Sequence, residues 1–269
     1  MGKANFYYPL PKEVKEKAFG FKHSNFGLLF SRFIGYEKNW ELKKEKVWGE
    51  LENKIEKIYK DSKLNEIMEA LKNRQENILD QQRDIFKIES FFAKVVWRLT
   101  IGLGSSTVME TGMAFHRIYG IPYIPSTAQK GLLKSYYKEK GFNENDKKMI
   151  LIFGDQRNKG KVTFFDAFPE SLIIDGKPII ELDIMNPHYQ PYYSDEKGKV
   201  PPADYFSPVP IKFLTIRKGT VFRFFLSLEK KYEGQINLNE VKKDLIKTLE
   251  EFGIGAKTRV GYGEMEKCQ

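Results

Sequence analysis

Near its end the chain reads GIGAKTRVGYGEME, from Gly253 to Glu266. This stretch holds two Gly-apolar-Gly pairs, formed by Gly253 and Gly255 and then by Gly261 and Gly263. The five residues between the pairs include two cations, Lys257 and Arg259. Glycines let a backbone approach a ligand closely and adopt positive φ, where successive N–H groups can bind an anion. The stretch therefore predicts a phosphate-binding loop, with a tight structural turn as the alternative interpretation.

Two common nucleotide-binding motifs do not fit the same stretch. A Walker A loop needs Gly before Lys-Thr, and it follows a strand and precedes a helix. Here Ala256 precedes Lys257, and a helix is expected upstream of the loop. The G-x-G-x-x-G motif fails because Thr258 stands where the third glycine belongs. The pattern thus disfavours ATP and dinucleotides as ligands.

Outward from the loop, the sequence alternates between strands and helices. A helix is expected from about Leu238 to Phe252, because Asn237 and Glu240 resemble a capping box and Gly253 suits a helix end. Upstream, the patterns predict strands at Val95–Ile101 and Lys161–Ala167, and helices from Ser126 or Thr127 to about Lys140 and from Asp146 to Phe153. They also predict a hairpin over Ser171–Met185 that turns at Asp175-Gly176, and two strands over Ile211–Leu228, around Lys218-Gly219.

This order predicts the fold class and the domains. An α+β order of this kind suits a ferredoxin-like, RRM-like core with helices on one face of the sheet. We assign the core to residues 93–269, with an inserted loop or hairpin at 185–213. Residues 186–210 hold six of the chain's 12 prolines. Residues 1–92 are expected to form an N-terminal helical elaboration, since the charged stretch from about Trp40 to Phe92 has a helical apolar period.

The helix expected after IPYIP offers a second anion site. Lys130, Lys134 and Lys138 are spaced by four residues and so share one helical face. Ser126 or Thr127 is expected to cap the first turn, where free N–H groups and the helix dipole attract phosphate. The alternative is an ordinary solvated face of an amphipathic helix.

Composition narrows the class of partner. The formal net charge is +9 and the sequence pI is about 9.2, which favours a polyanionic partner, although lysine-rich surfaces also serve solubility. A single cysteine, Cys268, excludes an internal disulfide and a Cys-based zinc site, and the three histidines lack metal-binding spacing. We expect no metal and no cofactor. The first residues lack a signal-peptide pattern and no apolar run could span a membrane, so a cytoplasmic location is expected.

Several segments carry a resemblance to a known family. They are the two glycine pairs, Ile124–Lys134 (IPSTAQKGLLK), and Phe153-Gly154 followed by Gly160–Ala167 (GKVTFFDA). Together these resemble the RAMP superfamily of CRISPR-associated proteins, over roughly residues 95–263. Ser126 stands where that family has glycine, and Gln129 where it has an aliphatic residue. Further segments resemble subunits of the type III-B (Cmr) effector complex: Gly102–Gly104, Met109–Thr111, Met185–Tyr189 and Pro208–Thr215.

The resemblance implies a function. A RAMP backbone subunit would bind CRISPR guide RNA and target RNA beside other Cmr subunits, here toward the 3′ region of the guide, in antiviral defence. It is not expected to cut RNA. RNA contacts are expected at Ser126, Thr127, Lys130, Lys134, Gly253, Gly255, Lys257, Arg259, Gly261 and Gly263. Such subunits also carry a protruding hairpin, for which the aromatic run with His188, Tyr189, Tyr192 and Tyr193 is the candidate protrusion or subunit interface.

Two other functions stay open. Metal-independent RNA cleavage needs a general base near a 2′-hydroxyl together with a cation, and His116 beside Arg117 is the one plausible pair. Glu110, in the loop after the first expected strand, is the acidic candidate for a RAMP-type endoribonuclease. The third possibility is a scaffold that contacts sister subunits and never touches RNA.

Overall fold

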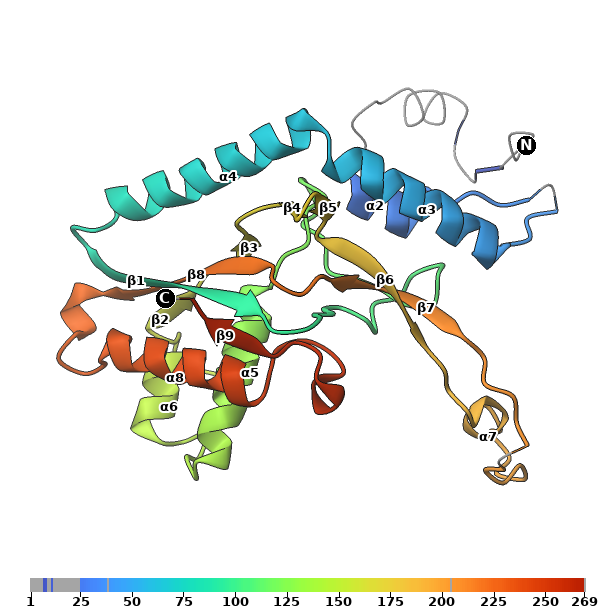
Figure 1. Cartoon of the computed structure of the whole chain (residues 1–269). Helices are drawn as coiled ribbons and strands as arrows, with labels where there is room; N and C mark the ends of the chain where they lie inside the picture. The colour runs from blue at the N-terminus through green and yellow to red at the C-terminus, as the bar shows by residue number, and fades with distance from the viewer. Residues whose placement is uncertain (1–6, 9–10, 12–24, 38, 204, 269) are drawn as a thin grey trace.

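The computed structural model describes residues 7–8, 11, 25–37, 39–203 and 205–268. Its centre is a five-stranded antiparallel sheet in the order β2-β8-β1-β9, with β3 pairing separately with β8 (Figure 1). These strands are β1 (Phe86–Val95), β2 (Val162–Phe164), β3 (Phe168–Pro169), β8 (Val221–Glu229) and β9 (Met265–Lys267). The central pair, β1 and β8, is in register from Phe86 opposite Glu229 to Lys94 opposite Val221.

Three helices cover one face of this sheet: α5 (Ser126–Glu139), α6 (Lys147–Phe153) and α8 (Leu238–Glu251). The second half of β1 alternates in burial, with Phe91, Ala93 and Val95 turned inward. The rings of Phe91 and Phe224 on the neighbouring strands stack at 4.8 Å between centroids. The hydrophobic core therefore includes the layer between the β1–β8 pair and these helices, and it continues into buried residues of the N-terminal part, such as Phe30, Trp48 and Tyr59.

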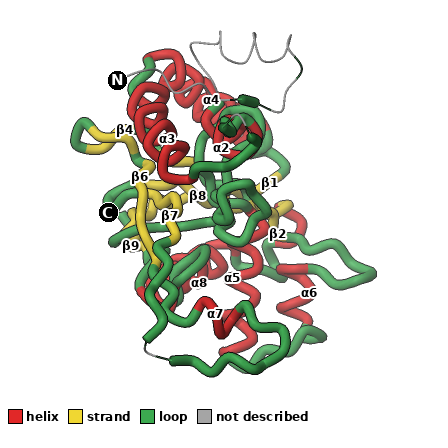
Figure 2. Tube along the Cα trace, turned by 90° about the vertical axis from the view of Figure 1, so that its right-hand side faces the viewer, coloured by secondary structure: helices red, strands yellow, loops and turns green. Residues whose placement is uncertain are grey.

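The N-terminal helices lie on the other side of the strands. They are α2 (Phe26–Arg32), α3 (Lys44–Tyr59) and α4 (Ser62–Gln81). Figure 2 shows them on one side of the strands, with α5, α6 and α8 on the other. An ion pair between Glu76 of α4 and Arg223 of β8 joins α4 to the sheet, and Lys72 pairs with Glu170 just after β3.

A two-stranded ribbon extends away from this body (Figure 1). It consists of β6 (Ile180–Met185) and β7 (Ile211–Ile216), which pair antiparallel with Met185 opposite Ile211. Residues 186–210, which we call the ribbon tip, join the two strands and contain the short helix α7 (Gln190–Tyr193). No residue of the tip's described part belongs to the main buried core.

Several predicted elements are confirmed. The helices predicted to begin near Ser126 and near Leu238 are α5 and α8, and Asn237 caps α8 by accepting the N–H groups of Asn239 and Glu240. The hairpin predicted over Ser171–Met185 is confirmed only around its turn at Asp175-Gly176, as the pair β4 (Ile173–Ile174) and β5 (Lys177–Pro178). Its second arm was predicted too long, because Ile180–Met185 forms β6 and pairs with β7. Two short 3-10 helices, η1 (Lys230–Tyr232) and η2 (Thr258–Val260), complete the described elements.

The predicted strand at Val95–Ile101 is wrong, and so is the continuation of the helical stretch to Phe92. The strand β1 begins at Phe86 and ends at Val95, because residues 86–94 form a continuous ladder with β8. After Val95 only isolated bridges follow, between Arg98 and Tyr262 and between Leu99 and Ile216. Pairing with β8, more than 120 residues away, determines where β1 lies, although the local apolar period favours a helix. The spacing of apolar residues does not predict such a distant pairing.

The other boundaries are shorter than expected. The strand predicted at Lys161–Ala167 is limited to β2, and the two strands predicted around Lys218-Gly219 are β7 and β8. These last two do not pair with each other, since β7 belongs to the ribbon and β8 to the central sheet.

Candidate nucleic-acid interface

The glycine loop, residues 253–263, lies along the segment that follows β1. The Ala256 N–H donates to the Thr100 carbonyl at 2.8 Å, and the Gly263 N–H donates to the Arg98 carbonyl at 2.7 Å. Within the loop, the Ile254 N–H donates to the Gly263 carbonyl at 2.8 Å. These bonds hold the two glycine pairs together and fix both against the backbone of residues 98–100.

The close approach explains the glycines at three of the four positions. A Cβ on Gly255 would lie 2.3 Å from the Thr100 carbonyl oxygen, and one on Gly263 would lie 1.9 Å from the Ile254 oxygen. At Gly253, which has φ of 67°, the nearest atom is the Gly263 carbonyl carbon at 3.0 Å. Gly261 differs, because its nearest neighbour is a Trp97 ring atom at 3.8 Å. The loop is thus a tightly packed turn, whatever it binds on its outer side.

The outer side of the loop carries the two cations. Lys257 adopts the left-handed conformation with φ of 60°, and its Nζ lies 5.7 Å from the centroid of the Phe213 ring. Arg259 is exposed on η2 beside Val260, whose exposed fraction is 63%. Neither cation forms an ion pair with an acidic residue in the described part of the chain. Both are therefore free to meet an anion from solvent.

The first backbone N–H group of α5 has a different hydrogen-bond acceptor from the one predicted. The expected capping by Ser126 or Thr127 is wrong, because the N-cap residue is Pro125 and makes no side-chain cap. Instead, the Ser126 N–H donates to the Oδ1 atom of Asp166 at 2.7 Å. A carboxylate from the segment after β2 thus occupies the place where phosphate was expected. No pattern in the sequence linked Asp166 to this helix end, since the two are 40 residues apart.

The lysines of α5 do share a face, but two of them are engaged. The Nζ atoms of Lys134 and Lys138 lie 3.2 Å and 2.6 Å from the same Glu144 Oε1 atom. Hydrogen bonds from Lys138 and then Lys134 hold the pKa of the Glu144 carboxyl below its usual value. Lys130 is half-buried and has no ion pair with a described acidic residue. Thr127 is exposed one turn before it.

The structure brings α5 and the glycine loop together. The helices α5 and α8 pack against each other, and the rings of Tyr136 and Phe252 meet at 5.8 Å. Phe252 immediately precedes Gly253, so the loop begins beside the second half of α5. Lys130, Lys257 and Arg259 therefore lie on two adjoining elements, although they are more than 120 residues apart in sequence.

A charged cluster lies at the base of the ribbon, and the sequence analysis did not predict it. Arg98 contacts Glu181 through Nε at 2.9 Å and Asp183 through Nη1 at 2.6 Å. Arg217 reaches the second oxygen of Glu181 at 2.9 Å. The Tyr262 hydroxyl donates to Asp183 Oδ2 at 2.6 Å, which connects the glycine loop to β6. The cluster joins four segments that are far apart in the sequence, so no local motif predicts it.

The cluster shifts the protonation of its members. Partial burial alone would raise the pKa of Asp183, but hydrogen bonds from Tyr262, the Ile184 N–H and Arg98 outweigh it and lower that pKa. Burial, followed by the hydrogen bond to Asp183, raises the pKa of Tyr262 to about 12. Near neutral pH the Asp183 carboxylate is therefore ionised and the Tyr262 phenol is neutral.

The ribbon tip carries the predicted aromatic residues. Tyr193 is 73% exposed, and its ring contacts that of Tyr192 at 5.3 Å. His188 is exposed, and Tyr189 accepts the N–H of Tyr193 at its carbonyl. These residues are brought together on one part of the ribbon tip and are separate from the glycine loop in sequence and in Figure 1.

The two candidate catalytic residues have partners already. The ring of His116 packs on Tyr119 at 4.6 Å between centroids, and its Nδ1 atom accepts two weak backbone N–H bonds at 3.4 Å. Burial lowers the pKa of His116, although the charge of Asp166 acts in the opposite direction. Glu110 is exposed with φ of 68°, and its carboxylate pairs with Lys44 Nζ at 2.5 Å.

The described residues contain neither a candidate metal site nor a helix that could span a membrane. Among the residues that the structure describes, no three His, Cys, Asp or Glu side chains gather in a way that could hold a metal ion. In the same residues, every helix is too short or too polar to cross a lipid bilayer.

Comparison of the sequence with known protein families identifies the class of protein. The profile of the RAMP superfamily matches residues 92–266, well over half of the chain. The chain therefore belongs to the RAMP superfamily. The helices α5, α6 and α8 and the C-terminal glycine loop lie within the matched region, whereas β1 begins before it at Phe86 and β9 ends after it at Lys267.

Individual relatives narrow the family further. The chain is 34% identical over 253 residues to "CRISPR system Cmr subunit Cmr6" of Pyrococcus furiosus, covering 73% of each chain. It is 27% identical over 261 residues to the Cmr6 subunit of Saccharolobus solfataricus, covering 95% of this chain and 74% of the relative. A chain in a cryo-EM structure of the type III-B Cmr-beta bound to cognate target RNA has a TM-score of 0.56, with 23% identity, over 85% of this chain and 76% of that one. At that identity the last likeness concerns the fold alone.

Proposed function

We propose that this protein is a non-catalytic, RNA-binding backbone or capping subunit of a type III-B CRISPR effector complex. It would contact the guide RNA toward its 3′ region and the target RNA, and it would pack against other Cmr subunits in the cytoplasm. One observation carries the proposal: Lys130, Lys257 and Arg259 lack acidic partners in the described chain and lie on adjoining elements. Cations so placed can neutralise successive phosphates of one strand.

The topology supports the same proposal. The chain passes from β1 through α5 to β2, and from β8 through α8 to β9, within the order β2-β8-β1-β9. We infer a ferredoxin-like, RRM-like core, because two split β-α-β units in this antiparallel order define that arrangement. RNA recognition by this kind of core is widespread.

We assign the ribbon a separate role. Its tip presents Tyr192, Tyr193 and Tyr205 to solvent, with exposed fractions of 44%, 73% and 79%. Exposed aromatic rings on a protruding ribbon can stack on bases or anchor in a partner's pocket. We propose that the ribbon tip, including His188 and Tyr189, contacts a guide–target duplex or a neighbouring subunit.

The geometry also argues against RNA cleavage by this chain. A general base must reach the proton that it removes, but Nδ1 of His116 faces its own backbone and the ring is packed among aromatic side chains. The Glu110 carboxylate is paired with Lys44, and a lone carboxylate cannot hold a catalytic metal ion. We therefore propose that cutting resides in another subunit.

A charge-reversal experiment tests the binding surface. We expect the Lys130→Glu, Arg259→Glu double variant to bind single-stranded RNA at least tenfold more weakly at about 0.1 M salt, with a shallower salt dependence. The measurement is fluorescence anisotropy with a labelled RNA. Lys57→Glu, Lys63→Glu makes the matched control, because both lysines are exposed on the N-terminal helices. Equal affinities for the two double variants would reject the proposed surface.

A cleavage assay tests the second half of the proposal. Labelled RNA incubated with the purified chain, with and without magnesium, is expected to stay intact on a denaturing gel. Shortening of the RNA that is lost in His116→Ala or Glu110→Ala would overturn the non-catalytic assignment.

A further inference from the structure

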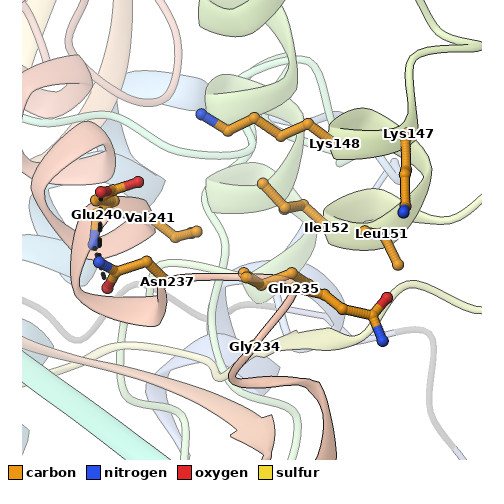
Figure 3. Close-up of a pocket in the computed structure, with 10 residues that line it drawn as sticks. Lys147, Lys148, Leu151, Ile152, Gly234, Gln235, Asn237, Glu240 and Val241 are labelled. Carbon is orange, nitrogen blue, oxygen red and sulfur yellow. Dashed lines mark hydrogen bonds between the residues drawn. The ribbon is translucent and has the colours of Figure 1, made fainter.

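A groove around α6 lies away from the glycine loop. One part is a pocket of about 450 Å³ between α6 and the start of α8 (Figure 3). A second pocket of about 310 Å³ lies on the other side of α6. Both are lined by Lys147 and Leu151, so they flank the same helix. We call the two pockets together the α6 groove.

The α6 groove is at the opposite end of the sheet from the glycine loop. The Lys161 N–H donates to the Leu151 carbonyl, and Val162 pairs with Leu228, which in turn lies opposite Lys87 near the start of β1. The glycine loop contacts the chain just after the end of β1. A strand of RNA bound along the glycine loop and α5 therefore leaves this groove available to a different partner.

The rim of the groove is cationic. It carries four lysines, Lys147, Lys148, Lys159 and Lys161, none of which forms an ion pair with an acidic residue in the described chain. Among the described residues that line the two pockets, Glu240 is the one acidic residue, and its carboxylate accepts a bond from Asn237 Nδ2 at 3.3 Å. An unpaired cationic rim of this kind favours a ligand rich in carboxylates or phosphates.

Two of these lysines are held in place by aromatic rings. The Nζ atom of Lys148 lies 4.6 Å from the centroid of Tyr137, and that of Lys161 lies 5.1 Å from the centroid of Tyr232. Such cation–π contacts restrict the side chains before any ligand arrives, so less conformational entropy is lost on binding.

The floor of the groove indicates whether the anionic partner is an acidic protein segment or a nucleic acid. It is aliphatic: Ile152 of α6 and Val241 of α8 point toward each other (Figure 3), and Leu151 and Ile236 also line the pocket. Within the described part of the chain, no aromatic side chain lines either pocket. Sites for single-stranded nucleic acid combine a cationic path for the phosphates with aromatic rings on which the bases stack, whereas an aliphatic floor accepts aliphatic side chains.

We propose that the α6 groove binds an extended, acid-rich segment of a partner protein. Aspartate or glutamate side chains would meet the lysine rim, and an aliphatic side chain would enter the floor between Ile152 and Val241. The inference deepens the proposed function, on which it rests for the setting of a multisubunit complex. RNA as the occupant is the competing outcome of the test.

Site-specific crosslinking tests the occupant. A photoreactive phenylalanine derivative replaces Gln235, an exposed residue that lines the larger pocket, and the variant is reconstituted with the other subunits and guide RNA. Mass spectrometry is expected to identify a crosslinked peptide rich in Asp and Glu from a protein subunit. Crosslinks to RNA, or an assembled complex without protein crosslinks at this position, would overturn the inference.

Charge reversal separates this inference from the proposed function. We expect Lys147→Glu, Lys159→Glu to weaken incorporation into the complex about tenfold, because rim charges steer and hold an acidic partner. Its affinity for single-stranded RNA should stay within about twofold of the wild type. The Lys57→Glu, Lys63→Glu control should assemble normally. Unchanged incorporation, or a loss of RNA affinity instead, would reject the acidic protein segment. A wild-type chain that never joins the complex would reject the proposed function as well.

Discussion

Single glycines decide how closely the glycine loop approaches the segment after β1. Gly255 and Gly263 each bring their backbone within a distance that any Cβ would violate, and each has positive φ. The same residues that resemble a phosphate-binding motif are thus needed for packing. Their role in stability can be measured apart from any role in RNA binding.

We expect Gly263→Ala to lower the free energy of unfolding by roughly 3 kcal/mol, because the new Cβ would collide with the Ile254 carbonyl oxygen and φ is positive. Chemical denaturation followed by circular dichroism measures the change. Gly261→Ala is the matched control, since φ is positive there too but the space is open. Its expected cost is only about 1 kcal/mol. Similar losses in both variants would contradict the packing explanation.

Asp183 is the residue at which pH should act on stability. We expect Asp183→Asn to lower the free energy of unfolding by about 2 kcal/mol near neutral pH, because it removes the charge that Arg98 and Tyr262 contact. The folded-state pKa is lowered from 3.8, so this contribution is present above about pH 4 and is lost as the pH falls through the folded pKa.

Urea denaturation at a series of pH values checks this prediction. The difference between wild type and Asp183→Asn should be largest near neutral pH and should shrink below about pH 4, where the carboxylate becomes protonated. A difference that is constant with pH would mean that the charge of Asp183 does not stabilise the ribbon base.

At the level of elements, α5 combines a buried face with a partly neutralised cationic one. Gln129, Leu133 and Tyr136 are buried, while Lys134 and Lys138 share the Glu144 carboxylate. Glu144 lies beyond the end of the helix, so the spacing of the lysines overstates the positive charge that an RNA strand would meet.

We expect Glu144→Gln to increase the affinity for single-stranded RNA about threefold at low salt, because it releases two lysines from their carboxylate. Fluorescence anisotropy measures the dissociation constant. Glu139→Gln is the control, since it removes the same charge from an exposed residue of α5 that has no lysine partner in the described chain. An equal gain in both variants would indicate a general charge effect without any contribution from the Glu144 pairs.

At the level of the whole molecule, the ribbon tip projects from the body and shares no part of the main core. Met185 and Ile211 face each other at the end of the β6–β7 ladder. The molecule therefore divides into a folded body, which carries the glycine loop and the α6 groove at opposite ends of the central sheet, and a ribbon that extends away from it.

Replacing residues 186–210 by an Asn-Gly turn should leave the body intact, because a two-residue turn can close an antiparallel ribbon. We expect the thermal midpoint to change by less than about 3 °C, while incorporation into the reconstituted complex falls at least tenfold. Circular dichroism and size-exclusion chromatography provide the two measurements. Normal assembly of the shortened chain would remove the ribbon tip from the proposed interface.

Local patterns in the sequence were enough to predict the family, the helices α5 and α8, the turn at Asp175-Gly176 and a cationic glycine loop. These features depend on local patterns, such as the Asn237 cap and the spacing of Lys130, Lys134 and Lys138. Local conformational preferences act over a few residues, so a single sequence carries them directly.

Three features became visible only in the folded chain: the residue at which β1 begins, the acceptor for the first N–H group of α5, and the lysines that lack an acidic partner among the described residues. Asp166 meets Ser126, and the ladder with β8 draws Phe86 into β1. The Arg98–Asp183–Tyr262 cluster likewise joins segments about 80 residues apart. Such contacts depend on long-range pairing of the chain, which gives no periodic signal in the sequence.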